Sequence, residues 1–66
     1  MAARFVFGVK QQNGQWQLLR NGVPVTHFSN MEEALREAEE MARQHFSSQV
    51  VVYRENGSVL NKFLVH

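Results

Sequence analysis

Few of the 66 side chains could do chemistry, and they are not grouped as a catalytic or metal site requires. The chain has no cysteine, and five of its six acidic residues, all glutamates, fall in one predicted helix beside two arginines. General acid–base catalysis needs carboxylates or histidines in a pocket that shifts their pKa. The three histidines show no metal-ligand spacing, and the serines lie at expected caps and turns. The sequence therefore predicts a protein that is not an enzyme and has no catalytic, metal or cofactor-binding residues.

Charge is divided between the predicted helix and the rest of the chain. Residues 31–46 hold two arginines and five glutamates, a net charge of −3, and the other residues hold five lysines and arginines and one glutamate, a net charge of +4. A basic sheet with aromatic side chains can bind a nucleic-acid backbone and stack bases. The alternative is that these cations only protect the solvent side and the edges of the sheet from pairing. The candidate nucleic-acid contacts are Lys10, Arg20, Arg54 and Lys62, with Gln17 and Tyr53 beside them.

Three Asn-Gly dipeptides, at residues 13–14, 21–22 and 56–57, predict three β-hairpins. Asn-Gly favours the type I′ turn because both residues tolerate the positive φ that this turn requires at its two central positions. Pro24 lacks an N–H, so the strand that contains it is expected at a sheet edge. The flanking apolar and β-branched residues predict strands over residues 4–10, 15–20, 23–27, 49–54 and 58–65.

Residues 31–46 are predicted to form an amphipathic helix, because apolar residues recur there at i, i+3, i+4 and i+7 spacing. Its start matches a capping box, either Ser29 with Glu32 or Asn30 with Glu33. Two i,i+4 ion pairs are expected on its outer side, Glu32–Arg36 and Glu39–Arg43. The small residues that would let this helix lie close to a sheet are Ala34, Ala38 and Ala42.

The last predicted hairpin carries apolar side chains on both faces. Three successive valines at 50–52 are typical of a central strand covered on two sides, whereas one helix covers only one face of a sheet. A chain of this length without disulfides also builds a thin core. We therefore expect a homodimer through the second face or an edge of the sheet. Whether the last hairpin stays with its own chain or is exchanged between copies is left open, with residues 46–48 as the hinge if it is exchanged. The interface candidates are Val51, Tyr53, Val59, Phe63 and Val65.

Composition favours one small folded domain over residues 1–66. Hydrophobic residues make up 44% and charged residues 20% of the chain, which is ordinary for a globular domain. The apolar runs are too short to cross a membrane, and the first residues lack the apolar stretch of a secretory signal. We expect a cytoplasmic protein whose partner is a second copy of itself, with nucleic acid as the alternative and with no membrane or small-molecule ligand.

The order of these motifs resembles a family of short bacterial proteins. The segment Asn13-Gly14-Gln15-Trp16 and the second Asn-Gly turn precede Glu33-Ala34 and the later helix alanines, and the valine run precedes Asn56-Gly57. The pattern is similar to domain-of-unknown-function family 2188, with departures at Asn56, where aspartate is usual, and at the helix end at 45–46. The resemblance spans about residues 5–63 and implies a bacterial or phage setting without an assigned activity. The predicted fold class is α+β in the order β-β-β-α-β-β, an antiparallel sheet with one amphipathic helix packed on one face.

Overall fold

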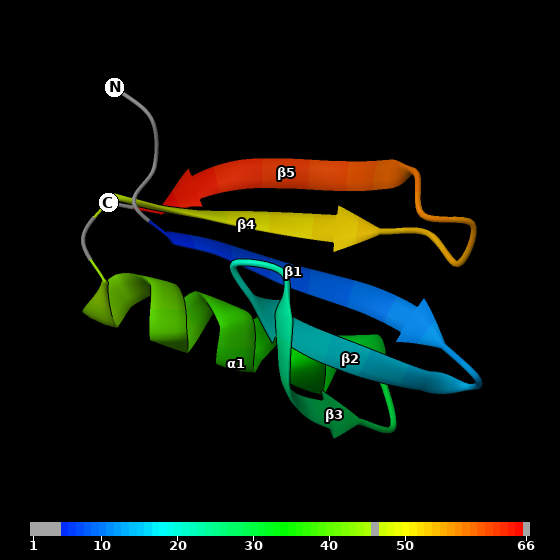
Figure 1. The fold of residues 1–66 in the computed structure, drawn as a ribbon. Coiled ribbons are helices and arrows are strands. Elements are labelled where there is room, and N and C mark those ends of the chain that lie inside the picture. Colours follow the sequence, from blue (N-terminus) through cyan, green and yellow to red (C-terminus); the bar gives the residue numbers. More distant parts are fainter. Residues whose placement is uncertain (1–4, 46, 66) are drawn as a thin grey trace.

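In residues 5–45 and 47–65, which the computed structural model describes, five strands form one sheet and a single helix packs against one of its faces (Figure 1). The α+β class and the β-β-β-α-β-β order are confirmed. Arg4 and Phe46, the expected first residue of the first strand and last residue of the helix, lie outside the described residues. The elements are β1 (Phe5–Gln12), β2 (Gln15–Arg20), β3 (Val23–Phe28), α1 (Met31–Gln44), β4 (Ser48–Tyr53) and β5 (Val59–Val65).

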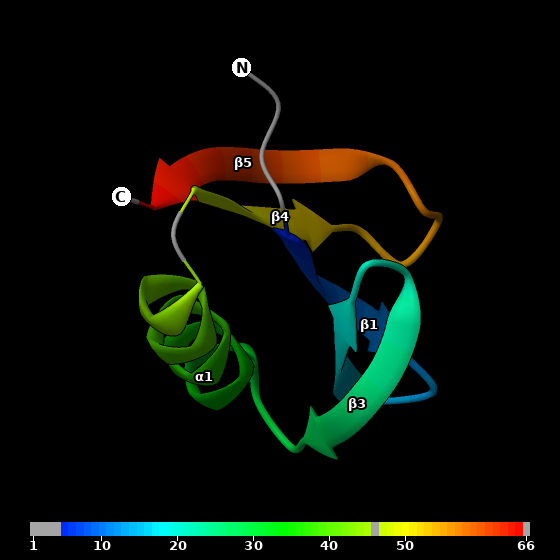
Figure 2. The ribbon, with the colours of Figure 1, turned by 60° about the vertical axis from the view of Figure 1, so that its left-hand side comes forward.

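The sheet is mixed, whereas a purely antiparallel sheet was the expectation. The strand order is β3-β2-β1-β4-β5, and β4 runs parallel to β1 while the other neighbours are antiparallel. The reason is the helix: α1 leads the chain from β3 back along the sheet, so that β4 starts at the same end as β1. Figure 2 shows α1 inside the curve of the sheet, with β3 and β5 as the two edges. The edge position predicted for the strand with Pro24 is confirmed.

All three predicted hairpin turns are present, but they are not of one type. Asn13 and Gly14 have φ of 52° and 76°, and Asn21 and Gly22 have 51° and 84°. Positive φ at both central residues is the signature of the type I′ turn. In the third turn only Gly57 has positive φ, at 92°. A longer connection between β4 and β5 therefore replaces the two-residue turn expected there.

The helix begins at an Asn30 cap, which selects one of the two predicted capping pairs. Asn30 Oδ1 accepts a hydrogen bond from the Glu33 N–H at 2.9 Å, and Asn30 Nδ2 donates to Glu33 Oε1 at 2.8 Å. The first bond satisfies one of the free N–H groups of the first turn. The helix ends at Gln44. The centre of the ring of the next residue, His45, lies 4.3 Å from the centre of the Phe5 ring. This contact ties the end of the helix to the start of β1.

The core lies between α1 and the sheet. Phe7 and Val9 of β1, the central strand, are fully buried there, and a buried side chain of this kind contributes about 1.5–3 kcal/mol to folding. The helix presents only alanines at its most buried positions, which lets it approach the strands closely. The fully or almost fully buried members of this cluster are Phe7, Val9, Leu18, Ala34, Ala38, Ala42, Val50 and Val52.

Candidate functional site: the open face and the β5 edge

The sheet face turned away from α1 is the candidate site, because no element of the described residues covers it (Figure 2). Side chains alternate along a strand, so the neighbours of the helix-side Phe7, Leu18, Val50 and Phe63 point to this face. It combines apolar, aromatic and cationic side chains. We call this surface the open face, and it includes Val6, Gly8, Lys10, Leu19, Val51, Tyr53, Lys62 and Leu64.

A shallow hollow of about 220 Å³ lies at the centre of the open face, above Gly8. A Cβ added to Gly8 would stand 3.1 Å from Tyr53 Cε2 and 3.6 Å from Leu19 Cδ1. The glycine thus allows the edge of the Tyr53 ring to rest against the backbone of β1. Glycine inside a strand is the sequence signal that could have located this feature. We call it the Gly8 hollow, and it is lined by Val6, Gly8, Lys10, Leu19, Gly22, Tyr53 and Gly57.

The four candidate nucleic-acid contacts do not share one surface. Lys10 and Lys62 are both on the open face. Lys10 is the register partner of Tyr53 on β4, and Lys62 is the register partner of Val51 on β4. Arg20 instead lies on the helix side, with its guanidinium carbon 5.9 Å from the centre of the Phe5 ring. Arg54 belongs to the turn after β4. The structure therefore brings together two of the four predicted cations.

The five interface candidates are also divided between the two faces of the sheet. Phe63 and Val65 pack against the helix-side core, so they cannot cover the second face. Val51 and Tyr53 are on the open face, where Val51 is only 6% exposed and has Gly8 and Lys62 as its register partners. Val59 stands opposite Tyr53 and is exposed. Two of the five candidates therefore belong to the helix side.

The edge strand β5 carries exposed apolar side chains that the sequence reasoning left out of the interface. Leu64 is 59% exposed and Leu60 is 49% exposed. Because side chains alternate along a strand, Leu64 must point to the open face once Phe63 and Val65 are known to face the helix. At the opposite edge, β3 also exposes Val23 and Val25. Exposed apolar side chains thus concentrate on the two edges.

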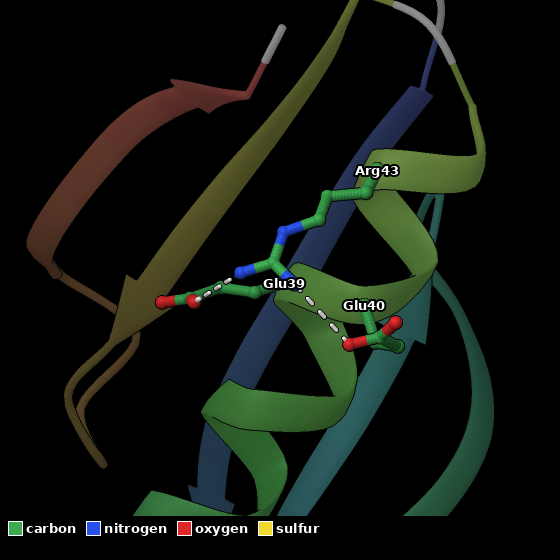
Figure 3. Close-up of polar contacts among 3 residues, drawn as sticks. All are labelled: Glu39, Glu40 and Arg43. Atoms are coloured by element: carbon green, nitrogen blue, oxygen red, sulfur yellow. Dashed lines mark hydrogen bonds and ion pairs between the residues drawn. The ribbon is translucent and has the colours of Figure 1, made fainter.

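The outer side of α1 is polar and acidic. Arg43 reaches Glu40 at 3.3 Å and Glu39 at 3.8 Å (Figure 3), and the side chains of Arg43 and Glu40 are largely exposed while that of Glu39 is 37% exposed. The expected pair of Arg36 with Glu32 is not formed in the described part of the chain. Exposed pairs of this kind contribute little to stability. The acidic helix and the two lysines of the open face therefore lie on opposite sides of the sheet.

Residues 5–45 and 47–65 contain no group of three or more histidine, cysteine, aspartate or glutamate side chains placed to hold a metal ion. In the same residues, no helix has the length and apolar character needed to cross a membrane.

The fold and this surface define a class of protein: a small α+β domain in which one helix covers one face of a mixed sheet and the other face is left open. The chain belongs to a bacterial family whose model, described as "Uncharacterized protein conserved in bacteria (DUF2188)", matches residues 6–62. The resemblance seen in the sequence is thereby confirmed. No curated protein and no solved structure shows significant similarity to the chain.

Proposed function

We propose that the chain is a non-catalytic interaction module that forms a homodimer through the β5 edge of its sheet. The observation that supports this proposal is an edge strand with apolar side chains: Val59, Leu60 and Leu64 are each about half exposed or more. An edge strand also presents unpaired N–H and C=O groups along its outer side. A second β5 strand would pair with these groups and bring the apolar side chains of the two copies into cross-strand contact.

The second edge of the sheet is less suited to this role. β3 contains Pro24, which has no N–H to donate, and its pairing with β2 is irregular next to Leu18 and Leu19. Both features interrupt an edge ladder and are common protections against pairing. The irregularity in the pairing of β5 falls at its start, beside Val59, and the register from Asn61 to Val65 is regular. The longer uninterrupted edge is therefore on β5.

The symmetry of the dimer follows from antiparallel pairing of two identical strands. Such a pair has its twofold axis perpendicular to the sheet. Both helices then lie on one side of a continuous sheet, and both open faces lie on the other. The dimer would leave the two Gly8 hollows uncovered.

The placement of the glutamates supports a non-catalytic role. The acidic side chains of α1 point outward, and Glu39 and Glu40 are both engaged with Arg43. Exposed carboxylates beside an arginine lack the enclosed environment that acid–base catalysis uses.

We also propose the cytoplasm as the location of the protein, which fractionation of a bacterium expressing the tagged protein would check.

Light scattering over a range of protein concentrations, at low and at high salt, tests the dimer. We expect a mass of twice 7.6 kDa that salt hardly changes, because the contact is apolar and uses backbone hydrogen bonds. Leu64→Lys should raise the dissociation constant about 2- to 30-fold, since it replaces an apolar cross-strand contact of about 0.2–1 kcal/mol at two symmetric positions of a twofold dimer and brings like charges together. Val23→Lys, an equal change at the β3 edge, is the matched control and should leave the dimer intact. A monomer at every concentration, or equal effects of the two variants, would refute the β5 dimer.

A further inference from the structure

We propose that the Gly8 hollow binds a base of single-stranded nucleic acid, with Tyr53 as the stacking ring and with Lys10 and Lys62 as contacts to the phosphates. This inference goes beyond dimerisation. Every residue it uses belongs to one chain, so it does not depend on the β5 interface.

The position of the Tyr53 ring is the first step. Tyr53 is on β4, yet its Cε2 atom lies 3.1 Å from the point where a Cβ of Gly8 on β1 would be. The ring therefore leans across the sheet toward β1 and does not stand upright from β4. The Tyr53 side chain is partly exposed, and we take its exposed part to include one face of the ring. Base stacking on such a face tolerates any base, because every base has a π-face.

The charge around the ring is the second step. Lys10 is the direct register partner of Tyr53. Lys62 lies on β5, opposite Val51 of β4. In the described residues, neither lysine forms an ion pair. The glutamates of α1 lie on the other side of the sheet. A polyanion is thus attracted to the open face and repelled from the helix side.

The shape of the site favours a single strand over a duplex. The hollow is shallow and mostly apolar, with Val6 and Leu19 on its walls. A base can enter it only if the face of that base is free. In a duplex the base faces are covered by stacking, whereas single strands can splay their bases onto aromatic side chains. We therefore expect unpaired bases to be the ligand, with DNA and RNA separated by experiment.

Fluorescence anisotropy with labelled single strands of about twelve nucleotides, close to the site sizes of small sheet domains, tests the proposal. Oligo-dT, oligo-U and a duplex of the same length are the three probes. We expect both single strands to bind at low salt, and the duplex to bind more weakly. A preference between dT and U would assign the natural ligand to DNA or to RNA. With two phosphate contacts, the logarithm of the binding constant should fall with that of the salt concentration with a slope of about −1.4.

Three variants separate this site from non-specific attraction. Tyr53→Leu keeps an apolar cover over Gly8 but removes the ring, and should weaken binding about 5- to 150-fold. Lys10→Ala should make the salt slope shallower by about 0.7. Arg36→Ala removes the same charge from the exposed side of α1 and is the matched control. It should leave the binding constant and the salt slope nearly unchanged. Circular dichroism of each variant establishes that it is folded.

The following results would overturn the proposal: no binding of either single strand at low salt, equal binding of the duplex, or equal losses in Lys10→Ala and Arg36→Ala. The solution mass of Tyr53→Leu supplies an independent readout. If that variant changes the mass of the protein, the open face is a contact between copies and not a nucleic-acid site. If the mass is unchanged and stacking is lost, the nucleic-acid site stands even where the β5 dimer fails.

Discussion

Two valines of the same sheet allow the role of the helix-side core to be measured with one chemical change. Val9 of β1 is fully buried and Val23 of β3 is 64% exposed. Replacing each by alanine removes the same two carbons and replaces the same β-branched side chain. The difference in unfolding free energy between the two variants therefore reports burial against α1 more than strand propensity.

The expected difference follows from the burial of Val9. Removing two methylene equivalents from a buried site costs about 1.6 kcal/mol of transfer free energy, and the cavity that remains raises the loss to about 2–3 kcal/mol. Val23→Ala should cost less than about 0.5 kcal/mol, as surface changes usually do. A domain of 66 residues has a total stability of about 3–10 kcal/mol. The Val9 variant should thus lose a large part of its stability and about 10–20 °C in Tm.

Urea titration followed by the fluorescence of Trp16 is a suitable assay, since this side chain packs against the core cluster. All proteins should be measured at one concentration, because dimerisation couples stability to concentration. Equal m-values would show that the variants share one unfolding transition. Val50→Ala, at a second fully buried position, should repeat the result for Val9. If Val9→Ala and Val23→Ala cost the same, the helix-side core does not stabilise the fold as reasoned.

Two smaller effects should follow from the helix. Asn30→Ala removes the side chain that accepts from Glu33 N–H and should cost about 1 kcal/mol in urea unfolding, whereas Ser29→Ala should be nearly neutral; equal losses would contradict the assigned cap. Arg43→Ala removes the contacts with Glu39 and Glu40 but should cost less than about 0.5 kcal/mol, and the cost should shrink in high salt; a larger, salt-independent loss would mean that Arg43 has a packing role.

The local chemistry of this chain is readable from its sequence, and its sheet order is not. Asn-Gly pairs, Pro24 and the Asn30–Glu33 cap act within a few residues of themselves, so the turns, the edge strand and the helix start were predictable. The parallel pairing of β4 with β1 depends on how α1, which follows β3, crosses the face of the sheet before β4 begins. The path of α1 is set by the packing of its alanines on the sheet, which no local motif reports.

The candidate site was only partly predictable for the same reason. Tyr53, Lys10 and Lys62 were among the predicted contacts, but their neighbourhood depends on register across three strands. The face that Phe63 occupies was not predictable, because a strand that is apolar on both sides does not show which side meets the helix. Gly8 was missed because its role appears only once the Tyr53 ring is placed above it.

The pairing register also brings the beginning and the end of the fold together. Phe5, the first residue of β1, is paired with Ser48, and Ser48 is paired on its other side with Val65, the last residue of β5. Two strand spacings amount to about 10 Å, a gap that a linker of a few residues spans. The path of the backbone is therefore almost a closed ring. A circular permutant joined there and opened at Asn56–Gly57 would start with the present edge strand and keep every pairing of the sheet.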